Sequence, residues 1–401
     1  MSEWKKYRLG EIAAIQTGPF GSQLHQSDYV EVGTPIITVE HLGENRILHN
    51  NLPKVNKEDK NRLKKYWLKE DDIVFSRVGS VDRRAYVKKN EDGWLFSGRC
   101  LRVRPTNKVN GGYLSYFFGL EDFKSKIRAV AVGATMPSLN TSIMKDIEVS
   151  LPDLSTQSQI AQILTSLDDK IELNLQMNQT LEAMAQALFK EWFVNFNFPG
   201  FDGELENGLP KGWRMGNLGE EFNLTMGQSP KGETLNQNNE GMIFYQGRTD
   251  FGFRFPSNRI FTTEPNRIAN RLDTLVCVRA PVGDINMAIE KCCIGRGLSA
   301  IMHKSDAYSY TYYSMKNIEP IFKGFESEGT VFGSLNKNNF ENIEIVIPIK
   351  QLIKKFEKMI NPIDEKILNN SLQIQTLTKT RDVLLPKLMS GKICLNTILK
   401  D

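Results

Sequence analysis

The sequence has few of the residues that build metal sites and disulfide frameworks. Its 401 residues include 5 cysteines and 4 histidines, and no pair of cysteines shows the CxxC spacing of zinc and redox motifs. We therefore expect no metal site and no disulfides, and the cysteines fit the reduced thiols of a cytoplasmic protein. No apolar run approaches the roughly 20 residues of a membrane helix. No apolar segment follows the charged residues 1–10 either, so we expect neither a membrane span nor a secretory signal.

Motifs of catalysis are also missing. A phosphate-binding loop needs GxxxxGK[ST], and the nearest match, residues 227–232, is followed by Glu233, whose carboxylate would repel a phosphate. The Asn/Asp-Pro-Pro-aromatic string of amino-methyltransferases does not occur in the sequence. These absences argue against a stand-alone nuclease or methylase.

The net charge is small as well, +4 from 51 basic and 47 acidic residues. The sum hides segments of opposite sign. Residues 1–150 carry 24 basic and 18 acidic residues (+6), and residues 206–348 carry 15 and 16 (−1). Residues 151–205 carry 2 and 8 (−6), and residues 349–401 carry 10 and 5 (+5). The first globular stretch therefore has an excess of cations that can hold nucleic-acid phosphates.

What the sequence does contain is an internal repeat. Trp4, followed by Leu-Gly-Glu at residues 9–11, recurs as Trp213 with Leu-Gly-Glu at residues 218–220. Gly-Arg at residues 98–99 recurs at residues 295–296, which matches Arg99 with Arg296. Ser-Leu-Asn and a following proline recur with a constant offset as far as about Leu188 and Leu384. This ordered set of matches predicts two copies of one unit, each a globular domain followed by a helix.

The segments after Pro152 and Pro348 have the heptad pattern of long helices. Apolar residues alternate at spacings of four and three, which is typical of a coiled-coil seam; they are Ile160, Leu164, Leu167, Ile171, Leu181, Ala185, Leu188 and Trp192 in the first copy and Phe356, Ile360, Ile363, Ile367, Ile374, Leu377, Leu384 and Leu388 in the second. Asn174 and Asn370 occupy the same seam position in the two copies. A buried polar residue there costs stability and sets register; a surface asparagine is the alternative.

One partial match to a metal-dependent nuclease falls in the first helical segment. Asp153, Asp168 and Lys170 fit a pattern in which two carboxylates hold Mg²⁺ beside a lysine. The second copy has Ile349 in place of the first carboxylate. We therefore favour a structural role for these residues.

The globular stretches are predicted to be α+β. Short apolar runs bounded by charge, glycine or proline indicate strands at residues 72–75, 275–278 and 343–347, and aromatic-rich segments at 113–123 and 308–322 favour helices. The predicted organisation is domain 1 at residues 1–152, a long helix at 153–198, a linker at 199–212, domain 2 at 213–348 and a second long helix at 349–401.

Polar and basic clusters beside glycines are the candidates for contact with DNA. Arginine can read guanine with two hydrogen bonds, glutamine can read adenine, and glycine lets a backbone approach a phosphate. The spacing of six from Asp71 to Arg77 matches that from Asp273 to Arg279, which is equally compatible with a structural ion pair. The candidates are Ser22, Gln23, Arg77, Ser80, Arg83, Arg84 and Arg99 in domain 1 and Gln228, Ser229, Lys231, Arg248, Arg279 and Arg296 in domain 2.

The ordered repeat resembles that of the specificity subunits of type I restriction–modification systems. The resemblance rests on two diverged domains alternating with two similar helices, on Leu-Pro-Lys-Gly-Trp at residues 209–213, and on Asp168-x-Lys170-Ile171-x-x-Asn174. It implies two structurally similar target-recognition domains, separated by conserved helices in an antiparallel coiled coil. Each domain would read one half of a bipartite, asymmetric DNA site.

The same resemblance implies partners for this chain. It would bind double-stranded DNA and two methyltransferase (modification) subunits, with restriction subunits as further partners. It would itself catalyse nothing and bind no cofactor, while its partners would use S-adenosylmethionine and, for restriction, ATP and Mg²⁺.

The sequence leaves two other functions open. A coiled-coil scaffold with two protein-binding domains is the main alternative, and the charge of residues 206–348 favours it. A stand-alone nuclease or methylase is the other, and the missing motifs argue against it.

Overall fold

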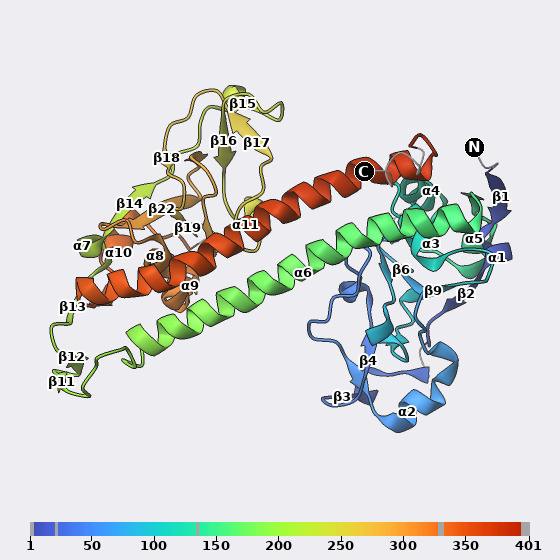
Figure 1. Ribbon diagram of the computed structural model, residues 1–401, viewed down its shortest axis with the longest axis horizontal. Helices are drawn as coiled ribbons and strands as arrows, with labels where there is room; N and C mark the ends of the chain where they lie inside the picture. Colours follow the sequence, from blue (N-terminus) through green and yellow to red (C-terminus); the bar gives the residue numbers. More distant parts are fainter. Residues whose placement is uncertain (1–3, 21–22, 134–135, 328–332, 394–401) are drawn as a thin grey trace. The chain divides into compact units, whose positions relative to one another are not determined.

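The computed structural model describes residues 4–20, 23–133, 136–327 and 333–393. The chain divides into two compact units: unit 1 comprises Met1–Ile171 and Thr376–Asp401, and unit 2 comprises Glu172–Gln375. Two long helices, α6 (Leu154–Phe193) and α11 (Lys350–Met389), each contribute to both units and are drawn without a break in Figure 1. We refer to the globular parts as domain 1 and domain 2. The predicted mixed α/β fold with an internal repeat is confirmed.

The described residues of domain 1 form three small sheets. A two-stranded sheet pairs β1 (Lys5–Arg8) with β10 (Glu148–Leu151). A central sheet has the strand order β2 (Ala13–Thr17), β9 (Cys100–Pro105), β6 (Ile73–Ser76) and β7 (Arg84–Tyr86). An outer sheet has the order β3 (Tyr29–Val30), β5 (Lys54–Val55), β4 (Thr34–Ile37) and β8 (Leu95–Phe96). The helices are α1 (Leu9–Ile12), α2 (Lys57–Arg62), α3 (Gly111–Phe117), α4 (Glu121–Val130) and α5 (Thr141–Asp146). Helices α1, α3, α4 and α5 lie near the central sheet, and α2 lies beside the outer sheet (Figure 1).

Domain 2 repeats this plan. Strand β13 (Arg214–Asn217) pairs with β23 (Glu344–Ile347). The central sheet has the order β14 (Phe222–Met226), β22 (Leu298–His303), β19 (Thr274–Cys277) and β20 (Ile285–Met287). The outer sheet has the order β15 (Leu235–Asn236), β17 (Ile260–Thr262), β16 (Met242–Tyr245), β21 (Cys292–Ile294) and β18 (Ile268–Ala269). The helices are α7 (Leu218–Glu221), α8 (Tyr308–Asn317), α9 (Glu319–Ser327) and α10 (Lys337–Glu341).

The apolar runs in the sequence are explained by central sheets that are covered on both faces. In β6, Ile73 and Phe75 belong to a core on the helix side, whereas Val74 belongs to a core shared with the outer sheet. In β19, Val276 belongs to the helix-side core and Leu275 to the outer core. Because successive strand side chains point to opposite faces, a strand with two buried faces must be apolar at every position. Figure 1 shows β3 and β4 beyond β6 and β9 as seen from α6.

The two long helices pack antiparallel within each unit. In unit 2, Asn178 of α6 lies beside Asn370 of α11, and further along α6 the Phe189 ring lies 5.6 Å from that of Phe356, earlier in α11. In unit 1, Asp168 accepts a hydrogen bond from Arg381, and Leu164 shares a core with Leu388. The predicted antiparallel coiled coil is therefore confirmed within each unit.

Both seam asparagines are buried, and their amides are satisfied across the helix pair. Asn174 donates to the side-chain oxygen of Gln373 at 2.7 Å, and Asn370 donates to that of Asn178 at 2.9 Å. Asn178 is equally buried, although the heptad pattern did not single it out. A shifted register would leave these amides without partners in an apolar seam, which costs about 1–3 kcal/mol each. Control of register by Asn174 and Asn370 stays a prediction.

The segment at residues 199–212, predicted to be a linker, contains a short hairpin. Strand β11 (Leu205–Glu206) pairs with β12 (Leu209–Pro210), and the turn between them uses Asn207 and Gly208, both with positive φ. Asparagine and glycine are the residues that a two-residue hairpin turn favours. The Phe198 ring stacks on Trp213 at 5.5 Å, so this segment is held against domain 2.

Candidate nucleic-acid interface

Domain 1 has a groove of about 800 Å³ where its central and outer sheets meet, lined by both polar and apolar side chains. It is lined by the turn after β2, the 3-10 turn Val39–His41 after β4, the loop after β6 and the loop before β9, together with residues at β3 and before β5. The lining includes two arginines, one glutamate, an aromatic ring and several neutral side chains that can form hydrogen bonds. These residues are Phe20, Gln26, Tyr29, Thr38, Glu40, His41, Asn51, Arg77, Ser97 and Arg99. Donors, acceptors and cations together are what a surface needs to read base edges beside phosphates.

Arg77 is held in this groove by two contacts. Its guanidinium carbon lies 4.5 Å from the centre of the Phe20 ring, and a terminal nitrogen donates to the carbonyl oxygen of Gly98 at 3.0 Å. Arg99 is exposed on the same loop as Gly98. The structure therefore brings together two arginines that lie 22 positions apart in the sequence. A guanidinium that is already oriented loses less conformational freedom when it binds.

The other candidates in domain 1 are more scattered. Ser80 is exposed, and Arg83 is half-buried and donates to the carbonyl oxygen of Leu42. Gln23 is exposed, but its side-chain oxygen accepts from the Tyr66 hydroxyl at 2.6 Å. Ser22 lies outside the described residues.

Arg84 is corrected by the structure. Its side chain is 3% exposed and donates to the carbonyl oxygen of Ser115 at 2.7 Å. Arg83 directly precedes β7, and successive side chains of an extended chain point to opposite faces, which explains why Arg84 is interior and Arg83 is not. Burial lowers the pKa of this guanidinium. In this fold Arg84 is an interior structural cation and not a residue that reads bases.

In domain 2 the corresponding turn is built on the same glycine geometry. A side chain at Gly227 would lie 2.1 Å from the carbonyl oxygen of Gly295, and one at Gly18 would lie 2.1 Å from that of Ser97. Only glycine allows the turn after the first central strand to approach the loop before β9 or β22 this closely. Gln228 and Lys231 are exposed on this turn, and the hydroxyl oxygen of Ser229 accepts from the backbone nitrogen of Arg296 at 3.4 Å.

The domain 2 arginines singled out in the sequence are exposed. Arg248 forms an ion pair with Asp284 at 2.6 Å, and Arg279 and Arg296 lie on loops at the ends of central strands. A second groove, of about 320 Å³, lies on the outer sheet next to Arg248. Its polar lining side chains are Asn236, Gln237, Gln246, Thr249, Asp250 and Arg259.

The two grooves share elements of the repeat. Thr38 follows β4 in domain 1 as Gln246 follows β16 in domain 2, and each strand is followed by a 3-10 turn that lines its groove. Sequence reasoning missed most of these lining residues because single polar residues after short strands carry little signal. A polar residue that ends an apolar strand in both halves was the one available indication.

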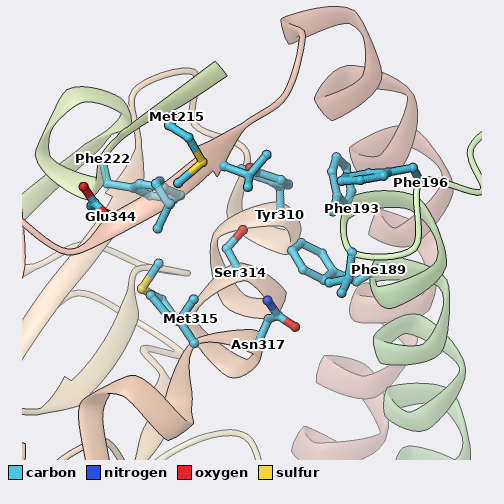
Figure 2. Close-up of a pocket in the computed structure, with 14 residues that line it drawn as sticks. Phe189, Phe193, Phe196, Met215, Phe222, Tyr310, Ser314, Met315, Asn317 and Glu344 are labelled. Atoms are coloured by element: carbon cyan, nitrogen blue, oxygen red, sulfur yellow. The ribbon is translucent and has the colours of Figure 1, made fainter. Parts of the chain in front are cut away.

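Unit 2 also has an apolar pocket of about 270 Å³. None of the residues that line this pocket also lines the groove of domain 2. Figure 2 shows aromatic side chains of α6, among them Phe189 and Phe193, facing Tyr310 of α8 and Met215 of β13. The described lining residues include no lysine or arginine. A surface that holds phosphates needs cations, so this pocket is not part of the candidate interface.

Comparison with known proteins gives a family for this geometry. A model of the type I restriction modification DNA specificity domain matches residues 1–183 and again residues 210–379. The chain belongs to this family. It is 30% identical to the "Putative type I restriction enzyme MjaX specificity subunit" of Methanocaldococcus jannaschii, over 98% of this chain and 95% of that protein. It is 26% identical to the HindI specificity subunit of Haemophilus influenzae, over 98% of this chain and 100% of that protein.

A solved structure agrees with the fold. The type I restriction–modification S subunit from M. genitalium is 18% identical to this chain and has a TM-score of 0.63. The superposed region covers 96% of this chain and 96% of that chain. The two matches of the family model include the two globular domains in which the grooves lie. None of the described helices is long and apolar enough to cross a membrane.

The backbone pairing of the two specificity domains corrects two matches made from the sequence. Arg77 donates its backbone nitrogen to Arg99, and Leu139 donates to Arg77, whereas in domain 2 the same bonds join Val278 to Gly297 and Leu335 to Val278. Arg77 therefore corresponds to Val278 and not to Arg279, and Arg99 corresponds to Gly297 and not to Arg296. A shift of one residue turns a strand side chain to the other face, so the two domains present their arginines differently.

The same pairing matches Asp72, and not Asp71, with Asp273. The backbone nitrogen of Val87 donates to Asp72, as that of Ala288 donates to Asp273. Neither aspartate of the spacing match pairs with the arginine six residues later: Asp71 accepts a hydrogen bond from the Tyr86 hydroxyl, and Asp273 accepts one from the backbone nitrogen of Asn270. Asp72 binds Arg104 at 2.6 Å. Burial, together with the charge of Asp306, raises the pKa of Asp273 to about 6.

We expect Asp273→Asn to stabilise unit 2 at pH 7 by about 1–2 kcal/mol, a value reduced for partial solvent screening. The folded-state pKa of Asp273 is above its ordinary value, so its ionisation opposes folding increasingly as the pH rises from about 4 to about 6. The gain should therefore vanish below about pH 4, and urea denaturation at several pH values measures it. Asp72→Asn is the matched control and should destabilise unit 1, because it leaves Arg104 without its carboxylate. An Asp273→Asn effect that did not depend on pH would contradict this account.

The partial nuclease pattern is not assembled in the structure. Asp153 caps the start of α6, where its carboxylate accepts from the backbone nitrogen of Thr156 at 3.0 Å. Asp168 lies 15 residues further along α6, about 22 Å away at ~1.5 Å per residue. Its carboxylate binds Tyr116 and Arg381. One metal ion cannot bind both carboxylates at that separation, and no group of three metal-ligating side chains occurs among the described residues.

Proposed function

We propose that this chain reads a bipartite, asymmetric DNA sequence, with domain 1 contacting one half and domain 2 the other. The observation that carries the proposal is the presence of one groove in each specificity domain, each lined by the 3-10 turn that follows the equivalent strand, β4 or β16. The side chains differ between them: Arg77, Thr38 and Glu40 line one groove, and Gln246, Thr249 and Arg259 line the other. Because different side chains select different bases, the two half-sites should differ in sequence.

The chemistry of each groove supports direct reading of bases. Arginine forks fit the two acceptors of guanine, and glutamine fits the donor and acceptor of adenine. Domain 1 also has the larger excess of positive charge, which strengthens its attraction to phosphates. Domain 2 is nearly neutral, so its binding depends more on cations placed locally, such as Arg248, which is exposed despite its pair with Asp284.

The chain acts as the specificity subunit of a larger assembly in this proposal. It binds double-stranded DNA and directs two methyltransferase subunits, with restriction subunits as further partners. It catalyses no step itself and holds no cofactor. The methyltransferase subunits bind S-adenosylmethionine, and the restriction subunits use ATP and Mg²⁺. Because the substrate is chromosomal DNA, the assembly works in the cytoplasm.

Exchange of one domain tests the proposal. The chain is expressed with its methyltransferase partner, and methylated adenines are mapped at base resolution in cellular DNA. Replacing residues 1–152 by the equivalent domain of a relative should change one half of the methylated sequence and leave the other half and its spacing intact. Replacing residues 213–348 should do the reverse. Methylation without sequence selectivity, or a change in both halves after a single exchange, would contradict the proposal.

A further inference from the structure

We propose that Arg254 is a positioning residue that ties the base-reading part of domain 2 to the helix pair of its own unit. This inference rests on the proposed function. Arg254 is 1% exposed and lies on the loop Phe251–Pro256, which the strand-like bridge between those two residues closes. The loop comes directly after the turn at Arg248–Asp250, whose Thr249 and Asp250 line the domain 2 groove.

The guanidinium of Arg254 reaches both long helices. One terminal nitrogen lies 2.8 Å from the carboxylate of Asp364 in α11, and the other lies 3.3 Å from that of Glu182 in α6. A buried charge persists only when it is paired and hydrogen-bonded. The fork geometry of arginine therefore fixes the loop against two helices at once, which the single ammonium of lysine cannot reproduce.

Two tyrosines of α8 complete the site. The guanidinium carbon lies 3.6 Å from the centre of the Tyr312 ring, and the Tyr313 hydroxyl accepts from Arg254 at 3.0 Å. The Tyr313 hydroxyl in turn donates to Asp364 at 3.0 Å, and that of Tyr312 donates to Glu182 at 3.2 Å. Loop, domain helix and helix pair thus share one hydrogen-bonded network, so movement of the loop requires several buried polar groups to lose partners together.

Domain 1 has the same loop without the same tie. Its loop Leu42–Ile47 is closed by the equivalent bridge, and Asn45 stands where domain 2 has Arg254. Asn45 makes a neutral hydrogen bond with Ser115, the position of Tyr312. The tyrosine–aspartate bond is repeated, as Tyr116 to Asp168 at 2.7 Å, but there its arginine is Arg381 of α11.

This contrast separates positioning from stability. In both units an arginine binds the repeated aspartate; Arg254 is 1% exposed and Arg381 is 15% exposed, so both units should lose stability when that arginine is removed, unit 2 the more. Only in unit 2 does the arginine belong to the loop beside the groove. Loss of Arg254 should therefore change how domain 2 reads its half-site, whereas loss of Arg381 should change stability alone.

The test uses the full chain with its methyltransferase partner and duplexes in which single bases of each wild-type half-site are replaced. Arg254→Met should lower discrimination at the domain 2 half-site at least 10-fold and leave the other half-site unchanged, and Arg254→Lys should give an intermediate loss. Arg381→Met is the matched control and should preserve discrimination at both. A variant that combines Arg254→Met with Glu182→Gln and Asp364→Asn removes the unpaired buried charges and should regain stability.

The combined variant decides between the two roles. Relaxed reading of the domain 2 half-site in a stable combined variant supports positioning. Full discrimination in that variant, or in Arg254→Met itself, would overturn it. The proposed function fails separately, if the wild-type chain shows no two-part methylation target.

Discussion

Replacing Arg77 and Arg99 together by alanine should lower methylation of the target sequence by about 100-fold or more. Both side chains line the domain 1 groove, and Arg77 is already oriented by the Phe20 ring and the carbonyl oxygen of Gly98. A bidentate arginine–guanine contact is worth about 1–3 kcal/mol of discrimination, so two such contacts give a combined loss of roughly 2–6 kcal/mol. The rate of methyl transfer to a target duplex measures the effect.

The control for this double variant removes the same charge elsewhere in unit 1. Arg8 pairs with Asp146 on the surface, and Arg128 pairs with Glu121 and Asp82. Replacing Arg8 and Arg128 by alanine also lowers the net charge by two, and it should reduce DNA binding slightly and equally for all sequences. If both double variants weakened methylation to the same extent, Arg77 and Arg99 would contribute only general electrostatic attraction. An unchanged thermal transition of unit 1 shows that its fold is retained.

Replacing Phe356 by alanine should destabilise unit 2 by about 3–5 kcal/mol, a typical cost of removing a buried aromatic ring. Phe356 is fully buried, and its ring lies 5.2 Å from Phe193 and 6.3 Å from Tyr313. It therefore joins both long helices to α8 of domain 2. Removing the ring opens a cavity where α6, α8 and α11 meet. A shift of one of these helices alone cannot fill that cavity.

Met359 provides the matched control on the same helix. Its side chain is 49% exposed, so Met359→Ala should change the free energy of unfolding by no more than about 0.5 kcal/mol. Urea denaturation followed by tryptophan fluorescence measures both variants, since Trp192, one of the 5 tryptophans, lies 5.9 Å from Phe356. Equal shifts of the denaturation midpoint in both variants would show that Phe356 stabilises this core no more than an exposed side chain does.

The elements that the sequence predicted well are those with a repeating apolar pattern. The heptads predicted two long helices, and α6 and α11 cover residues 154–193 and 350–389. The apolar run at 275–278 predicted a strand, and β19 occupies Thr274–Cys277. Burial against a fixed neighbouring surface imposes these periods on the sequence, so the periods can be read without the structure.

Correspondence between the two copies was predicted less well in the domains. The helices match at one constant offset, but insertions within the domains shift the offset several times. The motifs Gly-Arg at 98–99 and at 295–296 look equivalent, yet the backbone hydrogen bonds show that Arg99 of domain 1 is equivalent to Gly297 of domain 2. Short identical strings cannot reveal a shift of one residue, because strand register is set by hydrogen bonds between segments far apart in the chain.

The sequence by itself determined the fold class, the duplication and the coiled-coil seam, with Asn174 and Asn370 on it. It also supplied the family resemblance that comparison with known proteins bore out. Only the tertiary structure decided which side chains gather in the two grooves, that Arg84 is interior, and that Arg254 reaches both helices. The physical reason is the range of the interactions involved. Helix and strand patterns repeat over a few residues, whereas a binding groove and a buried ion pair join residues up to 110 positions apart, as Arg254 and Asp364 are.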